Sequence, residues 1–178
     1  MIRAVRQRTP KPDRSDLRVQ DLAKLLDTNP RRIEGWVEQG FLKPAHPGRG
    51  TGRPHRFTLE NLATAYVMTE LQRIHGDKSQ VLDGLLSSEP AADYARTLSR
   101  WLRAAPSSED VAFGSSPSAT LALVRHADGT VEGRVEKGHD GRVVLDYLKR
   151  FVGDCVGITL LSPGDEFRAM QERLAEHD

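Results

Sequence analysis

Two consecutive arginines, Arg31 and Arg32, carry the chemistry that points most directly to a partner. They follow Asn29 and a proline, and because Asn is a favoured N-cap and Pro suits the first helical position, both arginines fall in the first turn of a helix predicted over 30–39. An arginine can donate two hydrogen bonds to one guanine edge, and the N-terminal end of a short helix is the part that enters a major groove. We therefore predict base contacts for these arginines, and phosphate or capping contacts for Thr28 and Asn29.

A second group of basic side chains lies in the stretch 43–56, which is rich in Gly and Pro and contains no acidic residue. Gly and Pro exclude regular structure, so an extended loop or a short hairpin is expected there. Such a loop can follow a phosphate backbone or enter a minor groove; the alternative is a solvated, flexible loop without a partner. The residues outside the helix that we predict to contact DNA are Arg18, Lys43, Arg49, Arg53, His55 and Arg56.

Three short helices are predicted to position these groups. Leu22 to Leu26 place apolar side chains on one helical face, and the helix 30–39 buries Ile33, Trp36 and Val37. Gly40 can end that second helix in the left-handed conformation. After the basic loop, Thr58 and the Asn three residues later are predicted to begin a third helix, which continues to Gly76.

The order and spacing of these motifs resembles the winged helix-turn-helix of MerR-type regulators and the related excisionase-like DNA-binding domains. The resemblance covers about residues 17–86, and its motifs are Leu17 to Leu26, Asn29 to Ile33 with Trp36, Gly40 to Pro44, and Arg56 to Leu62. It implies double-stranded DNA as the partner and the loop 43–56 as the wing.

The chain departs from the family pattern at four positions, one of which is Arg18, in place of the hydroxyl that usually caps the first helix. The family usually has an Arg and an aromatic residue that hold phosphates just before the position of Trp36, where this chain has Glu34 and Gly35. His55 stands where the wing of the family has its typical arginine. We therefore expect the wing, rather than the recognition helix, to carry most of the electrostatic affinity.

Charge is divided unevenly along the 178 residues. The whole chain has 26 Lys and Arg against 25 Asp and Glu, but its first 60 residues hold 13 basic and 7 acidic residues, and the rest 13 and 18. Such asymmetry separates a half that binds a polyanion from a half with another role. Residues 1–16 are predicted to be a disordered basic arm, which would either add phosphate contacts or serve as a solubilising tail.

Composition argues against several classes of protein. Hydrophobic residues make up 38% of the chain, and no apolar run is long enough to cross a membrane or to form the core of a signal peptide. The single cysteine, Cys155, excludes an internal disulfide and the clustered thiolates of metal sensors, and its apolar surroundings predict a buried structural thiol. We expect no cofactor, no metal site and no enzymatic activity, and a cytoplasmic, nucleoid-associated bacterial protein.

The predicted fold class is α+β. A mainly helical domain, 17–103, is expected to include a helix from Asp77 and an amphipathic helix from Pro90, followed by a linker over 104–119. A small β-β-α-β-α unit, 120–178, should begin with a hairpin whose two-residue turn is Asp128-Gly129. Its other elements are a helix after Gly141, a strand over Cys155 to Leu161 and a helix through Phe167 and Leu174.

The second unit carries a few polar residues that could take part in acid–base chemistry, but turn formation is the preferred interpretation for them: His126, Asp128, His139, Asp140 and Cys155. We expect the unit to serve self-association in a homodimer, ligand sensing, or contact with RNA polymerase or another protein. The leading function is a sequence-specific transcriptional regulator. The alternatives are an excisionase-like or chromosome-organising architectural factor, and a protein-interaction module with no role on DNA.

Overall fold

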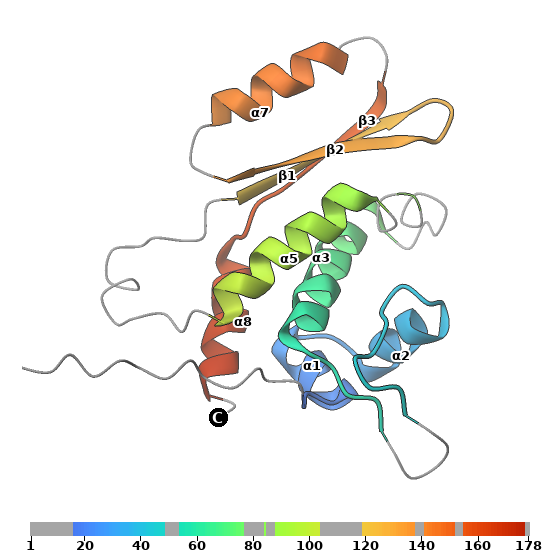
Figure 1. Ribbon diagram of the computed structural model, residues 1–178, viewed down its shortest axis with the longest axis vertical. Coiled ribbons are helices and arrows are strands. Elements are labelled where there is room, and N and C mark those ends of the chain that lie inside the picture. Colours follow the sequence, from blue (N-terminus) through green and yellow to red (C-terminus); the bar gives the residue numbers. More distant parts are fainter. Residues whose placement is uncertain are drawn as a thin grey trace, which may run out of the picture.

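The computed structural model describes residues 16–48, 54–76, 84, 88–103, 119–137, 141–151 and 155–176. Its elements are α1 (Val19–Leu25), α2 (Pro30–Glu38), α3 (Leu59–His75), α5 (Glu89–Arg103), β1 (Ala119–His126), β2 (Val131–Lys137), α7 (Gly141–Leu148), a 3-10 turn (Lys149–Phe151), β3 (Cys155–Leu161) and α8 (Asp165–Glu176). The α+β class and the β-β-α-β-α order of the second unit are confirmed (Figure 1). The predicted arm up to residue 15, the helix predicted from Asp77 apart from Gly84, and residues 104–118 of the linker lie outside the described residues.

The three strands form one antiparallel sheet in the order β2-β1-β3. In the central strand, Val124 pairs with Glu132 of β2 on one side and with Ile158 of β3 on the other. Helix α5 packs against β1 and β2 on one face of the sheet, and α7 lies against β1 on the opposite face (Figure 1). The sheet therefore has β2 and β3 as its two edges.

The β1–β2 connection differs from the prediction. Residues 127–130 join the two strands, so the turn is longer than the two residues expected at Asp128-Gly129. The Gly129 amide donates to the His126 carbonyl at 3.1 Å, and Gly129 adopts a left-handed φ of 87°, which is the pattern of a type I turn followed by a left-handed residue. Asp128 Oδ1 accepts from the amide and hydroxyl of Thr130, which confirms its role as a turn former and lowers the pKa of its carboxyl.

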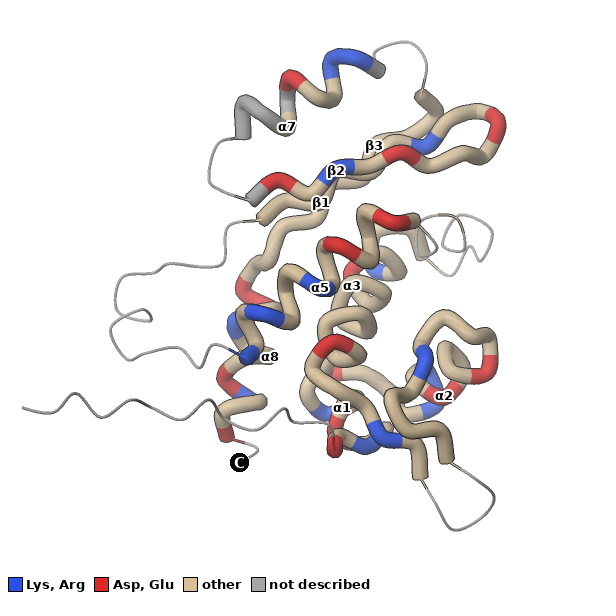
Figure 2. Tube along the Cα trace, in the orientation of Figure 1, with Lys and Arg blue, Asp and Glu red and all other residues tan. Residues whose placement is uncertain are grey.

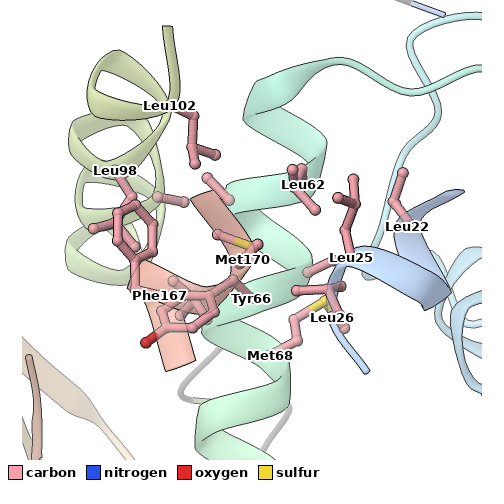
Figure 3. Packing of buried hydrophobic residues seen from close by; sticks show 14 of the residues in the cluster. Leu22, Leu25, Leu26, Leu62, Tyr66, Met68, Leu98, Leu102, Phe167 and Met170 are labelled. Carbon is pink, nitrogen blue, oxygen red and sulfur yellow. The ribbon is translucent and has the colours of Figure 1, made fainter. Parts of the chain in front are cut away.

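Helix α3 lies at the centre of the hydrophobic core and is buried on several sides. Leu62, Tyr66 and Met68 are each at most 4% exposed, and Figure 3 shows them between the leucines of α1 and the apolar side chains of α5 and α8. Side chains from the helix pair, from α5, from the sheet and from α8 all belong to the same cluster. The described α-helices other than α7 thus share one core with the sheet.

Direct contacts tie α8 to the helices that precede it by more than one hundred residues. Phe167 packs edge-on against Tyr66 of α3, with ring centroids 5.3 Å apart. The guanidinium of Arg173 donates to the carbonyl of Leu25 at 2.7 Å, so it satisfies one of the carbonyls at the C-terminal end of α1, where a cation is also favoured by the helix dipole. The last helix therefore supports the first.

Strand β3 buries one of its faces only. Thr159 is buried, and its hydroxyl shares a 2.7 Å hydrogen bond with Nε2 of His75, at the end of α3. Burial, with a smaller contribution from Arg125, lowers the pKa of His75, so this ring is neutral at neutral pH.

Cys155 is partly exposed, so the prediction of a buried thiol was wrong. The apolar run around it predicts a core position, whereas alternate residues of the strand are exposed.

Ala119 was assigned to the linker but is the buried first residue of β1. No helix among the described residues is both long and apolar enough to cross a membrane.

Gly133 marks a close approach between α5 and the sheet. A Cβ built on Gly133 would lie 2.7 Å from Leu123 Cδ2, 2.8 Å from Pro90 Cβ and 2.9 Å from the Ala122 carbonyl oxygen. Two of these neighbours are held by backbone or by a proline ring, so they cannot move aside easily. This position therefore requires a glycine for reasons of space.

We expect Gly133→Ala to lower the free energy of unfolding by about 1–3 kcal/mol, because overpacking forces the helix and sheet apart. Gly35→Ala is the matched control: its Cβ would meet nothing within 4 Å, and it lies inside α2, where alanine should stabilise by up to about 1 kcal/mol. Urea denaturation followed by circular dichroism measures both. Equal stabilities for the two variants would contradict the close packing at Gly133.

Candidate nucleic-acid interface

The helix pair α1–α2 is formed as its sequence predicts. Asn29 is the N-cap of α2, and its Oδ1 accepts from the Arg31 amide at 2.9 Å, with Pro30 at the first helical position. Ile33 and Trp36 are buried at 0% and 3% exposure, which fixes the orientation of the helix. The opposite side of α2 is thereby left in solvent.

Backbone conformation sets the turns at both ends of this pair. Asp27 adopts a left-handed φ of 50°, and the Thr28 amide donates to the Ala23 carbonyl at 2.8 Å, which closes the end of α1. Gly40 follows α2 with φ 79°, as predicted for the residue that ends this helix. These turns place the N-terminal turn of α2, with both arginines, on the surface.

Arg31 and Arg32 are exposed side chains of this first turn. Figure 2 shows basic residues on α2 and beside α1 at the end of the molecule opposite the sheet. The positive end of the helix dipole lies at the same place and adds to the attraction for an anion. The arrangement can present two guanidinium groups to a groove or to a phosphate.

The base of the wing is a short antiparallel ladder. His46 and Arg56 exchange two backbone hydrogen bonds of 3.2 and 3.0 Å, and Leu17 and Phe57 exchange two of 3.1 and 2.8 Å. The outer part of the loop, with Arg49 and Arg53, lies outside the described residues. The ladder joins the two ends of the loop to each other and to the segment that leads into α1.

His55 closes the same base through its ring. Its Nδ1 accepts a hydrogen bond from the Gly48 amide at 3.0 Å, so the ring proton of the neutral form is on Nε2. The ring also lies 6.3 Å from the ring of Phe57, centroid to centroid. His55 can therefore offer an Nε2–H donor without carrying a charge.

Arg56 has an acidic partner that sequence reasoning missed. Its guanidinium lies 2.8 Å from the Asp16 carboxylate and also donates to the Asp16 backbone carbonyl at 3.2 Å. The Arg56 side chain is 27% exposed, whereas that of Asp16 is 83% exposed. The signal in the sequence was an acidic residue at the end of a basic arm, but only the Leu17–Phe57 pairing brings it beside the wing.

Lys43 and Arg18 contribute mainly through their backbone in this structure. The Lys43 carbonyl accepts from the Asn61 side chain at 2.9 Å, and Asn61 forms the predicted capping interaction with Thr58 at the start of α3. The Arg18 amide donates to the Asp21 carboxylate at 2.8 Å, which completes one half of a capping box. Both basic side chains remain exposed on the surface that carries α1 and the wing.

Thr28 is half-buried, in the turn that precedes Asn29. Among the described residues, no group of three or more His, Cys, Asp or Glu could hold a metal ion.

Comparison with known proteins agrees with this geometry. Residues 17–89 match the family described as MerR HTH family regulatory protein. The match spans α1, α2, the wing and α3, and it stops at the first residue of α5. No curated protein matches the chain.

We expect Asn29→Ala to lower the free energy of unfolding by about 0.5–2 kcal/mol, because it leaves an amide of the first turn of α2 without its acceptor. Asn29→Asp should retain most of the stability, since aspartate caps helices equally well. Thermal and urea unfolding of the two variants test this. A destabilisation of the same size in both would assign another role to the Asn29 side chain.

Proposed function

Since residues 17–89 belong to the MerR helix-turn-helix family, we propose that this protein is a sequence-specific DNA-binding transcription regulator. The observation that carries the proposal is the exposed pair Arg31 and Arg32 in the first turn of α2, on a helix whose opposite face is buried. In this proposal α2 is the recognition helix, and its N-terminal turn enters the major groove of double-stranded DNA.

The same arginines also bear on the choice between a regulator and an architectural factor. A guanidinium that reaches base edges distinguishes sequences, whereas one that reaches only phosphates does not. Asn29 Oδ1 is occupied by its own helix cap, so we assign Asn29 to positioning the two arginines rather than to direct contact. We assign Thr28, the residue before Asn29, to a phosphate contact.

The wing is proposed to follow the DNA backbone or the adjacent minor groove. In support of this, the ladder at its base holds the two ends of the loop together beside the segment that leads into α1, and His55 has Nε2–H available as a donor. Glu34 and Gly35 leave α2 without the phosphate-holding side chains usual in the family. We therefore assign most of the electrostatic affinity to the wing, through Arg49, Arg53 and Arg56, with Lys43 and Arg18 as neighbours.

We expect Arg32→Ala to weaken binding to a specific site much more than binding to random DNA. A lost bidentate base contact costs roughly 1–3 kcal/mol of discrimination, which is about a 5- to 150-fold loss of preference. Arg100→Ala, an exposed arginine on α5, is the matched control and should leave the preference unchanged. Fluorescence anisotropy with a site selected from genomic fragments measures both.

The outcomes of that titration separate the candidate functions. Equal losses on specific and random DNA would mean that Arg32 holds only phosphate and would favour the architectural factor. Long, irregular footprints without a defined sequence would point the same way. Absence of binding at low salt would reject a role on DNA and favour a protein-interaction module.

A second expectation concerns the ion pair at the wing. Asp16 competes with phosphate for Arg56, so Asp16→Asn should tighten DNA binding and steepen the slope of log affinity against log salt by about 0.9, the contribution of one phosphate contact. Glu172→Gln removes the same charge from an exposed position of α8, outside the proposed DNA-binding surface, and controls for the change in net charge. The two variants are compared with wild type over a salt series. An identical slope in all three would show that Asp16 does not keep Arg56 from phosphate.

A further inference from the structure

The two edges of the sheet are treated differently by the sequence. Edge strands expose unpaired amides and carbonyls, and proteins usually protect them with charged side chains. Strand β2 follows that rule, since Glu132, Arg134 and Glu136 alternate along it. Strand β3, Cys155–Leu161, has no charged residue and no proline. Charged side chains therefore protect the β2 edge against pairing with another strand, whereas the β3 edge has no such protection.

Strand β3 also exposes a row of apolar side chains. Val156, Ile158 and Leu160 are 53%, 47% and 50% exposed. Among the described residues, only Ile74 is a further large apolar side chain with such exposure, and it precedes His75, which bonds to β3. The row lies on the sheet face that carries α7. Ile158 is opposite Val124 of β1, whereas the neighbouring Leu123 belongs to the core cluster on the face that α5 covers. Ala122 and Val124 are buried there, while the adjacent residues of β3 are not.

We propose that β3 is a homodimerisation edge, at which a second copy of the chain adds its own β3 in antiparallel orientation. A two-fold axis through Ile158, perpendicular to the sheet, pairs Val156 with Leu160 of the partner subunit and Ile158 with its own copy. In an antiparallel pair, residues directly opposite each other share a face, so this register brings the whole apolar row of one copy against that of the other. A neutral, apolar strand fits this edge, and β3 itself meets both conditions.

This symmetry also suits the helix-turn-helix. Rotation about an axis perpendicular to the sheet keeps each face on its own side. Helices α1 and α2 lie on the side of the sheet opposite α7 (Figure 1), so in the dimer both helix pairs lie on the same side of a six-stranded sheet. Two recognition helices on one side are what a site with two half-sites requires. This last step rests on the proposed function, but the dimer itself does not.

The first test measures assembly without DNA. Sedimentation velocity of the reduced full-length protein should show a dimer. Ile158→Lys should raise the dimer dissociation constant by roughly 30-fold or more, because it places two charges together at the centre of the interface. Ala92→Lys adds the same charge at an exposed position of α5 and should leave the dimer intact. A monomeric wild type, or equal dissociation constants for the two variants, would overturn the proposal.

The second test uses a disulfide cross-link to measure the register of the two β3 strands. It does not depend on a destabilising substitution. In a Cys155→Ser background, Ile158→Cys should form an intermolecular disulfide under mild oxidation, since opposite Cβ atoms lie about 4.5–5.5 Å apart. Wild type should not, because Cys155 would be about 20 Å from its copy, six residues along the paired strand. Ala92→Cys in the same background is the control for random collision. A cross-link no faster than that control would reject this interface, whether or not the protein binds DNA.

Discussion

The rest of the structure depends on the burial of α3. Its leucines, alanines and Tyr66 pack against α1 on one side and against α5 and α8 on others, so the helix cannot expose any of these faces without opening the core. A helix that is apolar on several sides is stable only when it is surrounded. The helix-turn-helix obtains its support from this constraint, because α1 and α2 are too short to be stable alone.

The C-terminal unit is consequently part of the support for the DNA-binding surface. Phe167 packs beside Tyr66, and Arg173 donates to a carbonyl at the end of α1, so α8 contacts both α3 and α1. A sheet of three strands covers α5 in the same way. A structural change in the sheet or in α8 can thus alter the packing of α1. The second unit can influence the first through these packed side chains.

Charged side chains are distributed differently at the two ends of the molecule. Basic side chains gather at α2 and the wing, where the only acidic partner found for Arg56 among the described residues is Asp16. The opposite end carries the sheet, with one charged edge and one neutral edge. We propose different partners for the two ends, a polyanion at one and an apolar strand at the other.

Local signals were sufficient for much of this protein. Asn29-Pro30, Gly40, and Thr58 with Asn61 act within a few residues, so their caps and turns were predicted from sequence, and hydrophobic periodicity was enough to place α2, α3, α5 and β3. The order of those signals was also sufficient to identify the helix-turn-helix.

Tertiary structure decided what depends on distant partners. The pairing of Asp16 with Arg56, the contact of Arg173 with Leu25, and the close fit at Gly133 all join residues that lie far apart in the sequence. The exposure of β3 is the clearest example. Its run of apolar residues predicts burial on both faces, as in the middle of a sheet, but only the strand order shows that it is an edge. Sequence periodicity reports which residues share a face; which face meets solvent is set by what packs on it.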